Sequence, residues 1–189
     1  KIEIYFKKYQ KKIKFIYAND YKNYNSLYSV YSAKNLLLNN NFLIINGDTI
    51  FPSTFLKNLI ENKNTSISLQ YSRNRIDAPK VFLNKKNLIK IDRHSKLKEN
   101  TNLKFKGFMT GMILINKNFS KVYFQKSKDL LNKNSDSGMY DPLTNVHRKN
   151  VDLIYQVGIW CDFDEIKDLP KVKLILNTNL KLKKLNYIL

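Results

Sequence analysis

The sequence predicts a three-layer α/β fold with a mainly parallel sheet and a β-hairpin insertion. Strand patterns and helical patterns alternate through most of the chain. Residues 42–45 form an uninterrupted apolar run that ends at Gly47 and Asp48, which is typical of a buried parallel strand. Two short alternating runs on either side of residues 84–87 indicate the hairpin.

Alternation or a short apolar run predicts strands at residues 13–17, 42–48, 66–71, 80–83, 88–91, 105–115 and 151–157. Gly107 and Gly111 interrupt the pattern of the sixth of these strands. Glycine inside a strand favours a bulge or a close approach of the backbone to a ligand.

Apolar residues at helical spacing predict helices at residues 2–9, 25–37, 52–61, 119–132, 141–149 and 165–176, with a basic tail at 181–189 that extends the last one. Asn25 or Ser26 can cap the second helix, and Pro52 suits the first turn of the third.

The length and cysteine content predict a single domain over residues 1–189 in a reducing cytoplasm. The one cysteine, Cys161, excludes an internal disulfide framework. No apolar run is long enough for a membrane span, and no signal peptide is visible. The chain opens with Lys1 and not with Met, so we expect N-terminal sequence to be absent.

A formal net charge of +19, from 34 Lys plus Arg against 15 Asp plus Glu, favours polyanions in general. The lysines are spread through the chain, whereas a nucleic-acid module concentrates them on one face or carries a reader motif. We therefore expect a solvated basic surface and no specific nucleic acid. A basic, non-enzymatic binding module stays open as an alternative.

Carboxylates at two distant places carry the functional hypothesis. Asp48 falls at the carboxyl end of a predicted strand, the edge at which open α/β sheets bind ligands. Asp162 and Asp164 are alternate residues, so on an extended segment both face one side. Turn chemistry is the alternative explanation of Asp48, and helix capping is that of the second pair. If the two segments are neighbours, Asp48 and Asp164 can bind Mg²⁺ and present it to a nucleoside triphosphate.

The chain resembles the nucleotidyltransferases that activate sugar phosphates and phosphocholine. The resemblance spans nearly the whole chain, and four segments in order carry it: Asn25-Ser26-Leu27-Tyr28-Ser29-Val30, Phe42-Leu43-Ile44-Ile45-Asn46-Gly47-Asp48, residues 110–115 and residues 160–169. The first of them is similar to an Asn-Asn-x-x-Ser-Leu segment of CTP:phosphocholine cytidylyltransferases, with Ser26 in place of the second asparagine and Val30 in place of the leucine.

This resemblance implies a Rossmann-like nucleotidyltransferase fold and a Mg²⁺ ion held by Asp48 and Asp164. It implies attack of an acceptor phosphate, from phosphocholine or a sugar 1-phosphate, on the α-phosphorus of an NTP, CTP favoured, with release of pyrophosphate. It also places the reaction in the synthesis of precursors for cell-surface polysaccharide or lipid. No covalent enzyme intermediate is expected, since such transfer needs positioning and charge neutralisation more than a nucleophilic side chain.

The same resemblance assigns roles to further residues. Asn25, Ser29 and Gly47 are expected beside the nucleotide, and Gly111, Arg93, Trp160 and Asp162 beside the acceptor. Lys90 is an alternative to Arg93 for the acceptor phosphate. Tyr28, Tyr31 and Trp160 can form an aromatic cage for a quaternary ammonium group, with a place in the core as the alternative.

The sequence departs from the family in having no glycine-rich loop to hold a triphosphate. Its five glycines, at 47, 107, 111, 138 and 158, are isolated, and no following arginine or Pro-Lys pair accompanies such a loop. We therefore expect an N-terminally truncated domain without its first strand and loop, inactive by itself. A nucleotide-sugar glycosyltransferase with an Asp-x-Asp metal motif is the enzymatic alternative, although Asp162 and Asp164 lie near the chain's end and not after a mid-chain strand.

Overall fold

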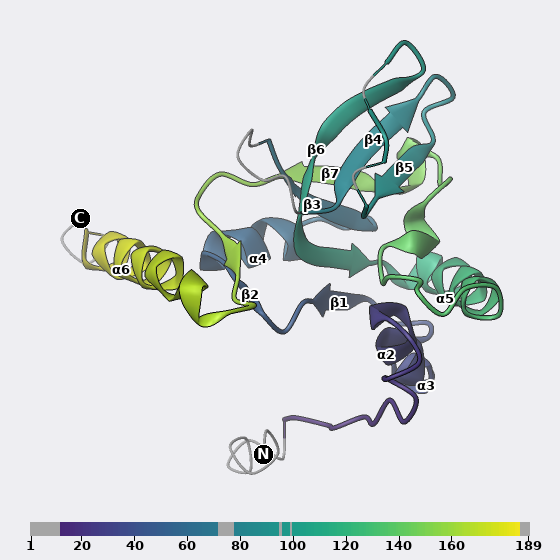
Figure 1. The fold of residues 1–189 in the computed structure, drawn as a ribbon, viewed down its shortest axis with the longest axis horizontal. Helices are drawn as coiled ribbons and strands as arrows, with labels where there is room; N and C mark the ends of the chain where they lie inside the picture. The colour runs from purple at the N-terminus through teal and green to yellow at the C-terminus, as the bar shows by residue number, and fades with distance from the viewer. Residues whose placement is uncertain (1–11, 72–77, 95, 99, 186–189) are drawn as a thin grey trace.

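The structure is a computed structural model that describes residues 12–71, 78–94, 96–98 and 100–185 (Figure 1). The predicted helix at residues 2–9 lies outside the described residues. The helices are α2 (Ser26–Ser32), α3 (Lys34–Leu37), α4 (Ser53–Ile60), α5 (Lys117–Leu131) and α6 (Leu169–Leu185), with short 3-10 turns η2 (Asp141–Leu143), η3 (Arg148–Asn150) and η4 (Ile166–Asp168). The strands are β1 (Phe42–Ile45), β2 (Thr49–Ile50), β3 (Ser66–Gln70), β4 (Lys80–Asn84), β5 (Ile89–Asp92), β6 (Leu103–Ile115), β7 (Asp152–Tyr155) and β8 (Cys161–Asp162).

Six strands form a mixed sheet around the long strand β6. The order is β5-β4-β6-β3-β7, and β1 pairs with the second half of β6. Because β6 runs antiparallel to β1, β3 and β4, and β7 runs parallel to β3, the strands β1, β3, β4 and β7 share one direction. The predicted α/β fold and the β4–β5 hairpin are confirmed. The sheet is mixed, however, since β3 and β7 are the one parallel pair of neighbours among the described strands.

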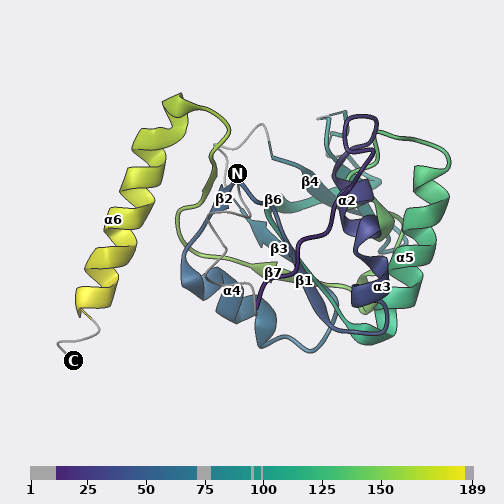
Figure 2. The same cartoon turned by 90° about the horizontal axis from the view of Figure 1, so that it is seen from below.

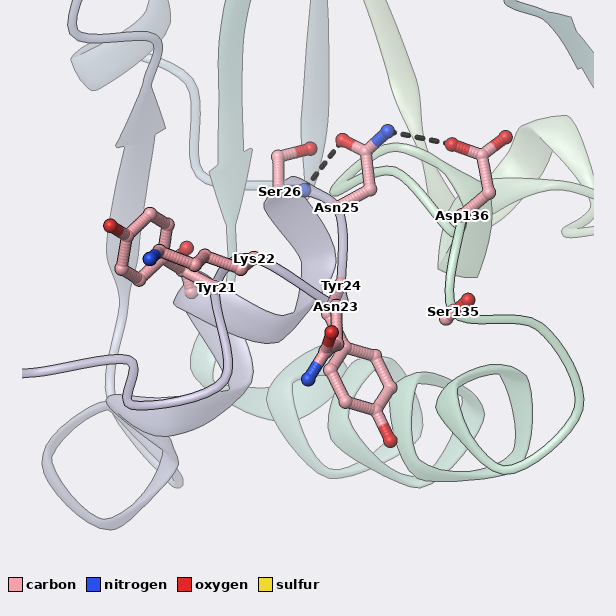
Figure 3. A pocket seen from close by; sticks show the side chains of 9 residues that line it. Tyr21, Lys22, Asn23, Tyr24, Asn25, Ser26, Ser135 and Asp136 are labelled. Atoms are coloured by element: carbon pink, nitrogen blue, oxygen red, sulfur yellow. Dashed lines mark hydrogen bonds between the residues drawn. The ribbon is translucent and has the colours of Figure 1, made fainter.

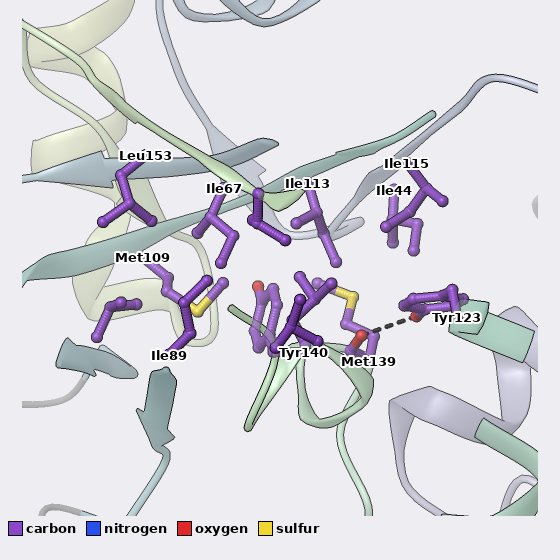
Figure 4. Close-up of a cluster of buried hydrophobic side chains, with 14 of the residues drawn as sticks. Ile44, Ile67, Ile89, Met109, Ile113, Ile115, Tyr123, Met139, Tyr140 and Leu153 are labelled. Carbon is purple, nitrogen blue, oxygen red and sulfur yellow. Dashed lines mark hydrogen bonds between the residues drawn. The ribbon is translucent and has the colours of Figure 1, made fainter. Parts of the chain in front are cut away.

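Two hydrophobic clusters cover the two faces of this sheet, which gives the three layers. The larger cluster joins residues of β1, β3 and β6, such as Ile113, to Leu27 of α2 and Tyr123 of α5 (Figure 4). The Tyr123 hydroxyl donates a hydrogen bond to the carbonyl oxygen of Met139 at 2.7 Å. The smaller cluster joins the opposite face of β6 to α4 through Phe55, and α4 lies across the sheet from α2 and α5 (Figure 2). The ends of the helices agree with their sequences, as Asn25 and Asn116 cap α2 and α5.

Three predicted elements are wrong or altered. Residues 13–17 form no strand, because they pair with no strand of the described chain, and Ile16 and Tyr17 are exposed. Residues 141–150 form two 3-10 turns instead of a helix, because the backbone is extended at Thr144 and His147 and Asn145 has a positive φ of 63°. The apolar run at 42–45 is a strand but pairs antiparallel with β6, not parallel.

Both predicted irregularities at glycines of β6 are confirmed. Near Gly107, which has φ +146°, β6 holds one residue more than β4 between the pairs Val81↔Gly107 and Phe82↔Phe105. Near Gly111, the pairing of β6 with β3 also shifts register. None of the helices among the described residues has the length and apolar character needed to cross a membrane.

Asp92 at the end of β5 gives a pH-dependent prediction. Burial alone raises the pKa of its carboxyl, but backbone N–H groups of Leu97, Lys96 and His94 donate to it and hold the pKa below its usual value. A lowered carboxyl pKa stabilises the fold above the unfolded pKa of about 4, and the effect is lost as pH falls through the folded pKa. We expect Asp92→Asn to lower the free energy of unfolding by about 1–3 kcal/mol at pH 7.

Urea unfolding of both proteins between pH 7 and pH 3 measures this difference. It should shrink below pH 4, because the wild-type carboxyl then becomes protonated. A difference that stays constant over this range would show that Asp92 does not act through its charge.

Candidate active site

A short two-stranded ribbon brings together the two acidic segments that the sequence singled out. Strands β2 and β8 pair antiparallel, with Thr49 opposite Asp162. The ribbon extends by one hydrogen bond, since the N–H of Phe163 donates to the carbonyl oxygen of Asp48 at 2.9 Å. Asp48 thus lies beside the segment from Asp162 to Asp164, although more than a hundred residues separate them in the sequence. In Figure 1 the ribbon continues from the turn after β1 and leads into α6.

Gly111 and Thr49 join this ribbon to the sheet. The N–H of Asn46 donates to the carbonyl oxygen of Gly111 at 3.0 Å, and the hydroxyl of Thr49 donates to Oδ1 of Asp162 at 2.6 Å. Gly111 has φ +78°, and a Cβ there would collide with Oγ1 of Thr49 and lie 3.2 Å from its Cβ. The close approach predicted at Gly111 therefore exists, but its partner is Thr49 of the protein itself.

The carboxylates of Asp48 and Asp162 place negative charge around the ribbon. Burial raises the pKa of the Tyr140 hydroxyl, and the charges of Asp162 and Asp48 raise it further, while a hydrogen bond with the Asn46 side chain opposes them. Among the described residues, neither Asp48 nor Asp164 forms an ion pair. Carboxylate oxygens are ligands that Mg²⁺ prefers, so the side-chain type of these two residues suits such an ion.

Asp162 and Asp164 differ in how far they belong to the ribbon. Strand β8 ends at Asp162, and Asp164 lies in the exposed turn that follows, where its N–H donates to Oδ2 of Asp168 at 3.3 Å. Within the described part of the chain, no group of three or more His, Cys, Asp or Glu residues is placed to hold a metal ion. A bound Mg²⁺ would therefore take its remaining ligands from phosphate oxygens and water, which is usual for this ion.

The predicted nucleotide residues Asn25 and Ser29 line an open pocket of about 490 Å³ (Figure 3). The loop before α2, the first turns of α2, and residues 135–136 form its walls. Neutral amide and hydroxyl groups make up most of the lining: Asn23, Asn25, Ser26, Ser29 and Ser135, with Tyr21, Tyr24, Lys22 and Asp136 completing it. Gly47, also predicted beside the nucleotide, is exposed in the turn after β1 and is not part of this pocket.

Arg93 already has partners in the protein. Its Nη2 lies 3.3 Å from Oδ2 of Asp136 and its Nε lies 3.4 Å from Oδ1 of Asp141, and its side chain is only 16% exposed. The alternative, Lys90, donates a hydrogen bond to Oδ1 of Asn145. Neither arrangement supports the predicted contact with an acceptor phosphate. What sequence reasoning missed is Asp136, which gave no signal beyond its type.

The predicted aromatic cage does not form. Trp160 is buried in the cluster with α4, and its indole N–H donates to Oε1 of Gln70 at 2.8 Å. Tyr31 packs against the opposite face of the sheet, edge-on to Phe124, and Tyr28 stacks on Tyr24. Because the sheet lies between Trp160 and Tyr31, these side chains cannot enclose one ligand.

Comparison with solved structures decides the fold type. The chain superimposes on the CTP:phosphocholine cytidylyltransferase from Streptococcus pneumoniae with a TM-score of 0.63 and 15% identity, over 93% of this chain and 75% of that one. It superimposes on the inositol-1-phosphate CTP transferase from T. maritima with a TM-score of 0.59 and 18% identity, over 86% of this chain and 65% of that one. The chain has the nucleotidyltransferase fold.

This nucleotidyltransferase fold is shared without close sequence similarity. No protein-family model matches the chain, and no curated protein matches it either. The chain spans about two thirds to three quarters of the length of the two cytidylyltransferase structures. The likeness confirms the predicted Rossmann-like fold.

Proposed function

We propose that this protein takes part in the transfer of a nucleotidyl group from an NTP, CTP favoured, to phosphocholine or a sugar 1-phosphate. The observation that carries the proposal is the β2–β8 ribbon. In a nucleotidyltransferase fold, it brings Asp48 at the carboxyl end of β1 beside Asp162 and Asp164. The cytoplasm, which supplies nucleoside triphosphates, is the proposed location.

In this proposal the residues position and neutralise the reactants and do not react themselves. An oxygen of the acceptor phosphate attacks the α-phosphorus of the NTP, and the bond to the β-phosphate breaks, so that pyrophosphate leaves with its electron pair. Asp48 and Asp164 would hold Mg²⁺, which supplies positive charge for the phosphate oxygens. Thr49 holds Asp162 beside them through the 2.6 Å hydrogen bond, and Asn25 and Ser29 meet the nucleotide.

We further propose that the 189-residue chain does not catalyse this transfer by itself. Its isolated glycines cannot form a loop of backbone N–H groups around a triphosphate. Pyrophosphate release from CTP, measured with phosphocholine or glucose 1-phosphate, should therefore stay at background. Turnover above background would contradict this statement but support the proposed reaction.

Binding of Mn²⁺ without nucleotide tests the proposed site directly. We expect Asp48→Asn and Asp164→Asn each to weaken Mn²⁺ binding roughly tenfold or more, because each removes a charged oxygen ligand. The free Mn²⁺ signal in electron paramagnetic resonance measures the affinity. Asp129→Asn is the matched control, since Asp129 lies on α5, bonds to Gln125, and carries the same charge.

The control should bind Mn²⁺ within about twofold of the wild type, because exposed charges far from a site act weakly. Wild-type affinity in both site variants would remove Asp48 and Asp164 from the proposed site.

A further inference from the structure

Both the oxygen and the nitrogen of the Asn25 side-chain amide form hydrogen bonds within the protein. Its Oδ1 accepts a hydrogen bond from the N–H of Ser26 at 2.6 Å, and its Nδ2 donates one to Oδ1 of Asp136 at 2.8 Å (Figure 3). A backbone N–H can only donate, and an ionised carboxylate can only accept. The Asn25 amide therefore has a single orientation that satisfies both partners.

Asp136 is itself fixed by Arg93. Nη2 of Arg93 lies 3.3 Å from Oδ2 of Asp136 and also donates to the carbonyl oxygen of the same residue. Nε of Arg93 pairs with Asp141, and Gly138 leaves room for the guanidinium, because a Cβ there would lie 2.8 Å from Nη1. The hydrogen bond from Asn25, and then the charge of Arg93, hold the pKa of Asp136 below its usual value.

This chain of contacts crosses three parts of the fold. Arg93 directly follows β5, Asp136 lies in the loop before η2, and Asn25 caps α2. The two carboxylates compensate the charge of the mostly buried Arg93 side chain. The last contact of the series, from Asp136 to Asn25, lies at the wall of the pocket. Because this wall offers neutral donors and acceptors from Asn25 and Ser29, the ligand class that suits it is an uncharged heterocycle such as a nucleotide base.

We propose that Asp136 is a positioning residue, braced by Arg93, that fixes the Asn25 amide and so sets the hydrogen-bond pattern offered to the nucleotide base. The inference rests on the proposed function, which places the nucleotide at Asn25. Asp136 also lines the pocket, but its proposed role acts through Asn25 and not through contact with the nucleotide. Polar groups that orient a binding residue in this way contribute to affinity without touching the ligand.

A double-mutant cycle on CTP affinity tests the proposal. We expect Asp136→Ala to weaken CTP binding roughly fivefold to tenfold, as loss of a hydrogen bond to a charged group does. In an Asn25→Ala background the same substitution should change affinity less than about twofold, because its target is gone. Isothermal titration calorimetry measures all four proteins, and Asp129→Ala serves as the control that removes an exposed carboxylate elsewhere.

Asp136→Asn provides a second variant that keeps the shape of the side chain and is expected to weaken binding in the same direction. The side-chain amide signals of Asn25 in ¹⁵N–¹H spectra give a readout without ligand, and both Asp136 variants should shift them. An unchanged CTP affinity in Asp136→Ala, or an equal loss in both backgrounds, would overturn the inference alone. Absence of CTP binding by the wild type would instead overturn the proposed nucleotide site, and the inference with it.

Discussion

Substitution of Gly111 by alanine is expected to lower the free energy of unfolding by about 2–4 kcal/mol. Two independent costs add up at this position. An L-residue at φ +78° is strained by about 1–3 kcal/mol, and the new Cβ forces Thr49 to move from its packed place. Because the hydroxyl of Thr49 bonds to Asp162, its displacement also disturbs the β2–β8 ribbon. Urea unfolding followed by circular dichroism measures the loss.

Gly47→Ala is the matched control for this prediction. Gly47 lies in the turn beside Asp48, has no positive φ, and has open space where a Cβ would be placed. Its replacement should change the free energy of unfolding by no more than about 1 kcal/mol, and in the stabilising direction if the backbone tolerates it. Equal losses in the two variants would show that the contact with Thr49 is not the cause of the Gly111 effect.

The strand β1 and the two glycines of β6 could be predicted because their signals are local. An apolar run that ends in Asn46-Gly47-Asp48 marks a strand and its end, whichever way its neighbours point. The direction of the neighbouring strand has no such local signal. A strand covered by helices on both faces has the same apolar pattern in a mixed sheet as in a parallel one, so the antiparallel partner β6 could not be foreseen.

At the candidate site, the β2–β8 ribbon could not be predicted from the sequence. Each strand has only two residues, too few for any periodicity, and the partners are far apart in the sequence. The sequence pointed to this pairing only through the acidic residues Asp48, Asp162 and Asp164 and through the resemblance to nucleotidyltransferases. The 3-10 turn η2 and the nearby Asp136 could not be predicted for a related reason, since their partner Arg93 follows β5 much earlier in the sequence.

Arg93 and Trp160 show why residue type alone misassigns roles. Arginine suits a phosphate and tryptophan suits a quaternary ammonium, but each also suits a buried structural place. Arg93 is surrounded by carboxylates that the fold supplies, and Trp160 finds Gln70 for its N–H within a hydrophobic cluster. In both residues the partner comes from another part of the fold, so the sequence holds no trace of the pairing.

Replacement of Phe55 by alanine is expected to lower the free energy of unfolding by about 3–5 kcal/mol and to loosen the segment that leads into β8. Phe55 is fully buried on α4 and belongs to the same hydrophobic cluster as Trp160, and a Cβ on Gly158 would lie 3.3 Å from its ring. The cost comes from the lost burial of the aromatic ring and from the cavity that its removal leaves in the core. Urea unfolding followed by circular dichroism gives the global loss.

The chain's single tryptophan makes the local part of this prediction measurable. Trp160 directly precedes β8, and its indole N–H is bonded to Gln70, whose Nε2 in turn donates to the carbonyl oxygen of Gly158. If α4 holds this segment through Phe55, the emission of Trp160 should shift to longer wavelength in Phe55→Ala at urea concentrations below the main transition.

Ile60→Ala, on the same helix but 60% exposed, should change stability by no more than about 0.5 kcal/mol and leave the emission unchanged. Coincident fluorescence and circular dichroism transitions in Phe55→Ala would mean that the segment unfolds only with the whole domain, and that the acidic ribbon does not depend on α4 for its place.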